Sequence, residues 1–153
     1  LGNRHPGTLA SIGNLGQLLY AKGDLAAAEP LYREALKVKR ETLGNRHPTT
    51  LISINNLGNL LHDKGDLAAA ELLSREALEG LRRTLGNRHP STLTSIGNLG
   101  ILWYAKGDLA AAELLLREAL EGQRETLGDE HPDTLLSIDN LDQLLQEQGD
   151  FAD

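Results

Sequence analysis

The sequence contains no cysteine and no methionine, and only five of its 153 residues are aromatic. Without cysteine the chain has no disulfide framework, no thiolate zinc site and no cysteine nucleophile, and this composition favours the reducing cytoplasm. Because the chain opens on Leu1 and has no recognisable signal or transit segment, we expect it to be a piece of a longer protein. No apolar run reaches the roughly 18 to 20 residues of a membrane-spanning helix, so we expect no membrane span.

Basic side chains are also in deficit, since 15 Lys and Arg stand against 22 Asp and Glu, for a formal net charge of −7. A negative chain has little general affinity for phosphate backbones or anionic lipid, so neither nucleic acid nor a membrane is an expected partner. The excess is local, because residues 127–153 hold eight acidic and no basic side chains. This segment is either a solvated end or a docking site for a basic partner segment.

The sequence is built on a repeat with a period of 42 residues. Leu-Gly-Asn-Arg-His-Pro stands at residues 1, 43 and 85, and a variant of it begins at residue 127. Across the copies 1–42, 43–84 and 85–126, 29 of the 42 positions are identical in all three, and the copy 127–153 is partial. We therefore expect one repeat domain over 1–153 rather than a domain with a single central core.

Each copy predicts two helices. The first begins at the His-Pro step, because proline at the first helical position gives up an amide that has no intrahelical partner, and it runs to Lys22 before Gly23. Asp24 then caps a second helix that continues to Leu43. Two such helices cannot bury their apolar faces alone, so the pairs should stack. This gives seven helices, the last unpaired over roughly 132 to 148, with Phe151 at the start of a truncated second helix.

The repeat resembles the tetratricopeptide repeat in the 42-residue form of kinesin light chains and of nephrocystin-like and NB-ARC or NACHT signalling proteins. The small-residue positions of the family match Gly16, Ala28 and Ala35 and their equivalents, where small side chains let helix axes approach closely. The resemblance implies an all-α fold, a right-handed α-α superhelix of about 3.5 repeats. Asp142 replaces the glycine in the last copy, and because burying its carboxylate would be costly, it predicts a solvated cap or a loosely paired last repeat.

Differences between the copies predict a binding surface. Positions 10, 13, 17, 20 and 21 and their equivalents change from copy to copy and share one stripe of the first helix, opposite the fixed Ile12 and Leu15. In tetratricopeptide arrays the corresponding stripe lines the concave groove that binds peptide segments of partner proteins. An unvarying asparagine lies beside the stripe, and a carboxamide can both donate to and accept from a peptide backbone. The candidate groove residues are Asn14, Gln17, Tyr20, Asn55, Asn56, Asn59, His62, Asn98, Ile101, Tyr104, Asn140 and Gln143.

Structural roles are open for the same residues. Each asparagine could instead bond to the neighbouring helix and fix the stacking of repeats, and Tyr20 and Tyr104 could shield the seam between repeats. The first helices carry cations only at their ends, at Lys22, Lys64 and Lys106. This pattern differs from that of the carboxylate-clamp members of the family, which bind acidic tails. A neutral, amide-rich groove predicts an uncharged or mildly basic ligand.

Catalysis has no candidate in the sequence, so we expect no enzymatic activity, no cofactor and no metal. His5, His47, His89 and His131 recur once per repeat, roughly 10 Å apart in a helical stack, without a second ligand at metal-binding spacing. A structural role in the turn between repeats is expected for them. His62 stands outside this motif and, as a groove residue, could make binding sensitive to pH. The sequence has neither a nucleophile-base pair nor a phosphate loop.

Three functions fit these observations. The leading hypothesis is a non-catalytic scaffold that binds a protein or peptide ligand in its groove. The second is a ligand-sensing arm of a multidomain NB-ARC or NACHT signalling ATPase, whose recognition arrays the near-identical copies resemble. The third is a self-associating element, because the first helix would expose Ile12, Leu15 and Leu19, and contacts between repeat ends give open chains.

Overall fold

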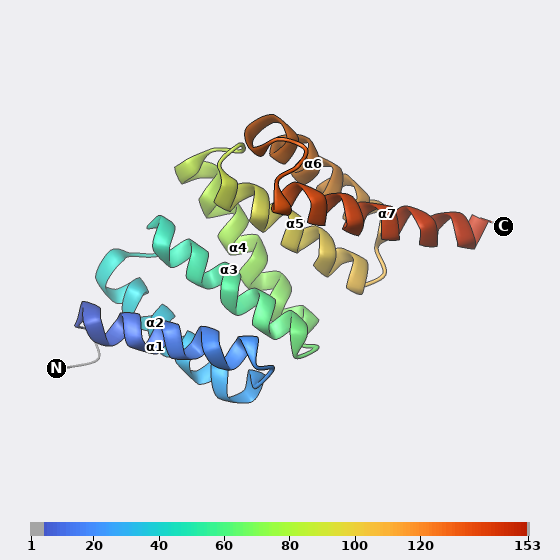
Figure 1. Ribbon diagram of the computed structural model, residues 1–153. Coiled ribbons are helices and arrows are strands. Elements are labelled where there is room, and N and C mark those ends of the chain that lie inside the picture. Colours follow the sequence, from blue (N-terminus) through green and yellow to red (C-terminus); the bar gives the residue numbers. More distant parts are fainter. Residues whose placement is uncertain (1–4, 153) are drawn as a thin grey trace. The chain divides into compact units, whose positions relative to one another are not determined.

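The computed structural model describes residues 5–152, and helices are the only regular secondary structure over that range (Figure 1). Its contacts divide it into two compact units, Leu1–Gly80 and Leu81–Asp153. In the first unit α1 packs on α2 and α2 on α3, and in the second α5 packs on α6, α6 on α7 and α5 also on α7. The helices are α1 Pro6–Ala21, α2 Leu25–Leu43, α3 Pro48–Asp63, α4 Leu67–Leu85, α5 Pro90–Ala105, α6 Leu109–Leu127 and α7 Pro132–Ala152.

The histidine of each His-Pro step is the N-cap of the first helix in its repeat. The Nδ1 atom of His47 accepts a hydrogen bond from the backbone N–H of Thr49 at 3.2 Å, and the other copies repeat this bond. The bond satisfies one of the donors that a helix start leaves without an intrahelical partner, while proline at the next position needs none. The structural role expected for these histidines is therefore confirmed.

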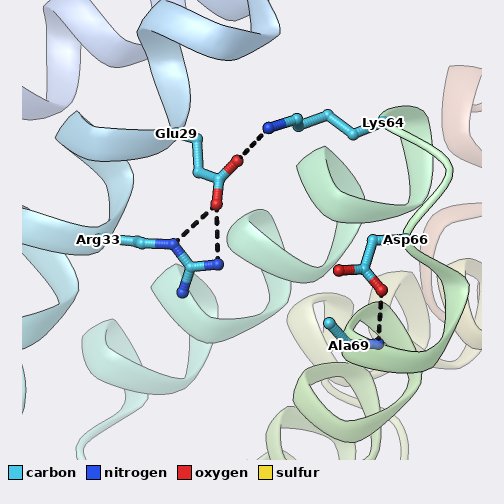
Figure 2. Close-up of polar contacts among 5 residues, drawn as sticks. All are labelled: Glu29, Arg33, Lys64, Asp66 and Ala69. Carbon is cyan, nitrogen blue, oxygen red and sulfur yellow. Dashed lines mark hydrogen bonds and ion pairs between the residues drawn. The ribbon is translucent and has the colours of Figure 1, made fainter.

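The turn inside each repeat depends on glycine and aspartate. Gly23 has φ +81°, a left-handed conformation that other residues adopt only at a cost, and it stops the first helix. The Oδ1 atom of Asp24 then accepts from the backbone N–H of Ala27 at 3.1 Å and caps the second helix. The same cap joins Asp66 to Ala69 at 3.2 Å (Figure 2).

The invariant apolar positions of α3 and α5 belong to the cores of their units. Leu51, Ile54, Leu57 and Leu60 of α3 are all buried, and so are their counterparts in α5. Buried threonines join consecutive repeats, since the Thr92 hydroxyl donates to the Leu81 carbonyl oxygen at 3.4 Å. No helix in the described part of the chain has the length and apolarity needed to cross a membrane.

Close approach of paired helices requires the glycine that recurs in the first helices. A Cβ atom added to Gly100 would lie 2.9 Å from a methyl group of Leu116 and 3.3 Å from Cβ of Leu115. Both contacts are shorter than ordinary van der Waals packing allows, so α5 and α6 could not keep their separation. Asp142 holds this position in α7 and is exposed. The last repeat is therefore solvated there, as the aspartate predicted.

The end of α7 differs from the prediction. We expected this helix to stop near residue 148 and a second helix to start at Phe151, but α7 continues through Gly149 to Ala152. Gly149 lacks the positive φ of Gly23 and its equivalents. The described residues contain no following helix that could pack on α7, so nothing there stabilises the tight turn over continued helix.

Ion pairs connect consecutive repeats on the second helices. Arg40 of α2 holds the carboxylate of Glu76 through both guanidinium nitrogens, at 2.7 and 3.1 Å. Glu29 accepts from Lys64 and, at 2.8 Å, from Arg33 (Figure 2). The hydrogen bond from Lys64, followed by that from Arg33, lowers the pKa of Glu29. Each pair is partly exposed, so it contributes to the geometry of stacking more than to stability.

Candidate functional site

We call the first-helix positions that vary between the copies the variable stripe, which lies on α1 and α3 in the first unit and on α5 and α7 in the second. All of its residues except one are exposed or half-buried, whereas the invariant leucines and isoleucines of the inner first helices are buried. The expected candidates Gln17 and Gln143 are exposed, and Asn59 is half-buried. The variable stripe consists of Ala10, Gly13, Gln17, Tyr20, Ala21, Ile52, Asn55, Asn59, His62, Asp63, Thr94, Gly97, Ile101, Tyr104, Ala105, Leu136, Asp139, Gln143, Gln146 and Glu147.

Asn55 is the exception, and its assignment to the groove is corrected by the structure. Its exposed fraction is only 5%, so a ligand could not reach most of its side chain. The equivalent position in α5 shows why, because a Cβ atom on Gly97 would lie 3.8 Å from Cβ of Ala119 on the paired helix. This position therefore faces the second helix of its own repeat rather than the outer surface.

The four asparagines at position 14 and its equivalents, Asn14, Asn56, Asn98 and Asn140, are exposed or half-buried. Among the described residues, none of their side chains hydrogen-bonds to a neighbouring helix. The Nδ2 atom of Asn98 is itself buried and has no hydrogen-bond partner. Among the described residues, the structure thus shows no side-chain hydrogen bond that would give these asparagines a stacking role.

Tyr20 bridges two repeats in the first unit. Its hydroxyl donates to one carboxylate oxygen of Asp63 on α3, and Nδ1 of His62 lies 3.2 Å from the other. The Tyr20 ring also packs on Tyr32, with 6.2 Å between ring centroids. Burial, and then the hydrogen bond to Asp63, raises the pKa of Tyr20 far above its usual value. Tyr20 and His62 therefore meet at one carboxylate.

The second unit repeats this arrangement with different partners. The Tyr104 hydroxyl donates to Glu147 on α7 and accepts from Nε2 of Gln143 at 3.2 Å. The hydrogen bond to Glu147 is the main cause that raises the pKa of Tyr104. Both tyrosines thus span the seam between neighbouring repeats while part of each ring stays exposed.

A small polar pocket opens beside the variable stripe of the first unit. Its volume is about 60 Å³, and it lies where α1, α2 and α3 meet. Gln17 of the variable stripe and Asn56, which lies beside the stripe, are among the residues that line the pocket. The sequence-based prediction missed its other polar residues, which are Tyr32, Lys39 and Ser53. Position 39 varies between copies, but it belongs to a second helix, whereas the predicted binding surface was confined to the first helices.

Lys39 is the one cation of this pocket. Its Nζ atom donates to the Ser53 hydroxyl at 2.7 Å, across the contact between α2 and α3. Burial lowers the pKa of Lys39, and no carboxylate among the described residues forms an ion pair with it. Gln17 and Asn56, whose amides are neutral donors, line the same pocket.

The equivalent place in the second unit is filled by apolar side chains. Ile101 stands where Gln17 stands in the first unit, and it packs against the cluster of α6 and α7. Leu116 replaces Tyr32 and is 2% exposed. Gln123 replaces Lys39 and is buried. Ile101 therefore belongs partly to the core of the second unit, although it was expected in the groove.

Reactive chemistry is not apparent in the described part of the chain, where no group of three or more His, Asp or Glu side chains could hold a metal ion. What the variable stripe and the pocket offer is hydrogen-bond donors and acceptors, aromatic rings and one unpaired ammonium group. Such a set can bind and discriminate ligands.

The model of the tetratricopeptide repeat family matches residues 7–83 and 49–125, well over half of the sequence. The chain belongs to the tetratricopeptide repeat family. Both the resemblance on which the sequence-based prediction rested and the all-α helical-repeat fold are thereby confirmed. Among curated protein sequences, none matches significantly.

Several solved structures have folds similar to that of this chain. BtubC from P. vanneervenii superposes with a TM-score of 0.82 at 25% identity, over 95% of this chain and 58% of its own. The nearly identical repeats of a kinesin light chain-like protein from Podosopora anserina give a TM-score of 0.76 at 30% identity, over 98% of this chain and 71% of theirs. A Q17M form of those repeats gives 0.78 at the same identity. The chain thus spans less than two thirds of the length of BtubC.

Proposed function

We propose that this tetratricopeptide chain is a non-catalytic scaffold, acting in the cytoplasm, whose variable stripe binds an extended peptide segment of a partner protein. Tetratricopeptide repeats are in general protein-interaction modules, which supports the coarser part of this proposal. One observation carries the rest. The residues of the variable stripe, Asn55 excepted, are exposed or half-buried, while the invariant apolar positions of α3 and α5 are buried in the core.

The unpaired amides favour an extended peptide over a folded surface. An extended segment exposes its backbone N–H and C=O groups along its whole length, and a carboxamide can satisfy either group. The asparagines 14, 56, 98 and 140 recur once per repeat and have no side-chain bond to a neighbouring helix.

The test is to select a peptide and then locate it. A random peptide library displayed on phage is selected against the chain, and the affinity of the selected peptide is measured by fluorescence anisotropy for Gln17→Ala, Asn56→Ala and Tyr104→Ala. Loss of a hydrogen bond should weaken binding by about threefold to tenfold in the variants that the peptide contacts.

Leu114→Ala is the matched control, because Leu114 lies on a second helix and is 74% exposed. Its affinity for the peptide should not change. Helical circular dichroism establishes that every variant is folded. If all three stripe variants bound the peptide as tightly as the unmodified chain, groove binding would be wrong.

End-to-end self-association is a second candidate, favoured by the outer face of α1. Leu15 and Leu18 are 47% and 51% exposed, whereas the equivalent Leu57 and Leu60 of α3 are buried. Ile12 and Leu19, which were also expected to be exposed, are half-buried. Since the same face is covered in α3, a second copy of the chain is a suitable partner for it. Sedimentation should show a mass that rises with concentration and is restored to the monomer by Leu18→Glu, and a constant monomer mass would reject this candidate.

A further inference from the structure

The pocket of the first unit contains an uncompensated charge. Lys39 is half-buried. The arginines of the same helix form ion pairs, Arg33 with Glu29 and Arg40 with Glu76. Among the described residues Lys39 has only the neutral hydroxyl of Ser53 as a partner. An ammonium group can donate three hydrogen bonds, so this lysine has donors left for a ligand.

The pocket also has the size and chemistry of a site for a small anion. Its volume of about 60 Å³ is enough for several water-sized groups, given roughly 10 to 15 Å³ for each. A carboxylate or phosphoryl group fits this space, whereas a large side chain does not. Gln17, Asn56 and Tyr32 also line the pocket, and their side chains carry further neutral donors. Hydrogen bonds from charged and neutral donors together bind oxyanions most strongly.

We infer that the pocket formed by Gln17, Tyr32, Lys39, Ser53 and Asn56 binds an oxyanion, a carboxylate or a phosphoryl group, carried by the peptide ligand. This inference rests on the proposed function and specifies the chemistry of its ligand. It replaces the expectation of an uncharged or mildly basic ligand for this end of the groove. That expectation counted cations on the first helices, whereas Lys39 reaches the pocket from α2.

The second unit is an internal comparison for the inference. Its three exchanges, Gln17 to Ile101, Tyr32 to Leu116 and Lys39 to Gln123, remove the cation and place two apolar side chains and a buried amide there. The helices keep the same lengths in both units, since α1 and α5 have 16 residues and α2 and α6 have 19. Lysine is therefore not required to build this helix pair. The oxyanion site is a property of the first unit.

The experiment uses the isotope-labelled chain and inorganic phosphate as the probe. Phosphate is titrated at an ionic strength held constant with sodium chloride, and NMR follows the Lys39 side chain and the side-chain amides of Gln17 and Asn56. Saturable shifts should gather on these residues. Lys39→Gln, which introduces the residue found at position 123, should weaken phosphate binding about tenfold through loss of the charged donor.

Two further variants separate charge from space. Tyr32→Leu keeps the cation but introduces the side chain that fills the second unit, so it should also weaken phosphate binding. Lys37→Gln removes an exposed charge of α2 outside the pocket and should leave binding unchanged. Equal phosphate binding by the unmodified chain and by both pocket variants, or shifts spread over exposed lysines, would overturn the inference.

Peptide probes then identify the source of the oxyanion. Four glycine pentapeptides are compared, three blocked at both ends with a central glutamate, phosphoserine or glutamine, and one with a free C-terminus. Binding of one or more charged peptides, lost in Lys39→Gln and absent for the glutamine peptide, is the expected result. If no charged peptide binds while a phage-selected peptide still does, the oxyanion inference fails and groove binding stands. If the charged peptides bind and no selected peptide contacts the variable stripe, the oxyanion inference stands and groove binding fails.

Discussion

Substituting the same leucine in two consecutive repeats should have very different effects on stability. Leu18 of α1 and Leu60 of α3 occupy equivalent positions in copies that are otherwise nearly identical. Leu60 is 0% exposed and Leu18 is 51% exposed. Both lie in the first unit, so Leu18→Ala and Leu60→Ala perturb the same part of the chain. The comparison isolates what covering a first helix contributes to stability.

The magnitudes follow from burial. Leu→Ala removes three carbon groups worth about 0.8 kcal/mol each when fully buried, or about 2.4 kcal/mol in total. At Leu60 the cavity that remains adds a further cost, so the free energy of unfolding should fall by about 3 to 4 kcal/mol. At Leu18 only about half of the transfer energy is lost, roughly 1.2 kcal/mol, because water occupies the vacated space. The two variants should therefore differ by about 2 kcal/mol.

Urea unfolding followed by far-ultraviolet circular dichroism measures this difference. With a slope of about 2 kcal/mol per molar urea, the two midpoints should lie about 1 M apart. Repeat arrays can unfold in stages, so hydrogen exchange of the α1 and α3 amides confirms that the loss is local to the first unit. Equal destabilisation by both variants would refute the reasoning, because it would mean that the outer face of α1 is covered in solution. A dependence on protein concentration would then identify a second copy as the cover.

Gly100→Asp should destabilise the second unit by about 3 to 5 kcal/mol in thermal unfolding, because it places a carboxylate between α5 and α6 without a partner. Asp142 is exposed, so Asp142→Gly should change stability by only about 0.5 kcal/mol. His89→Ala should lower the free energy of unfolding by about 0.5 to 2 kcal/mol, because the cap to the Ser91 N–H is lost. His89→Asn should restore most of this stability. An unchanged stability of His89→Ala would contradict the capping role. Tyr20, Tyr32 and Tyr104 all have raised pKa values in the folded chain, so spectrophotometric titration should show tyrosinate forming above the usual pKa of about 10. Because the pKa values are raised in the folded chain, the stability that these tyrosines contribute is fully present below the unfolded pKa. It is lost as the pH rises through the folded pKa values. Tyrosinate that formed at the unfolded pKa in the intact chain would disprove the raised pKa values.

Local signals in the sequence determined most of the fold. Proline after histidine and glycine before aspartate specify helix boundaries through the backbone itself, and the predicted starts at Pro6, Leu25 and Pro132 agree with the structure. The end of α7 could not be predicted in this way. The Gly149-Asp150 pair matches the turn of the other copies, but in those copies a packed second helix follows the turn.

The candidate site was harder to predict than the fold, because its geometry depends on contacts between helices. The period of 3.6 residues correctly identified the stripe that reaches solvent. It could not distinguish Asn55, which faces the paired helix, from Asn59 one turn later, which is half-buried. It also could not show that Lys39 of α2 crosses to Ser53 of α3, because that contact exists only after two repeats stack.

The internal repeats bear on whether Lys39 serves stability or binding. A half-buried ammonium group without a counter-ion lowers the stability of the unit that contains it, because burial disfavours its charged form. Leu81 and Gln123 stand at the same position in copies with the same helix pair, so the fold does not need a lysine there. A residue that the scaffold does not require, and that is unfavourable for the free chain, is expected where a ligand supplies the missing charge. Arg40, one residue later, shows the opposite pattern, because Arg40 and its equivalent Arg82 both pair with a glutamate of the next second helix.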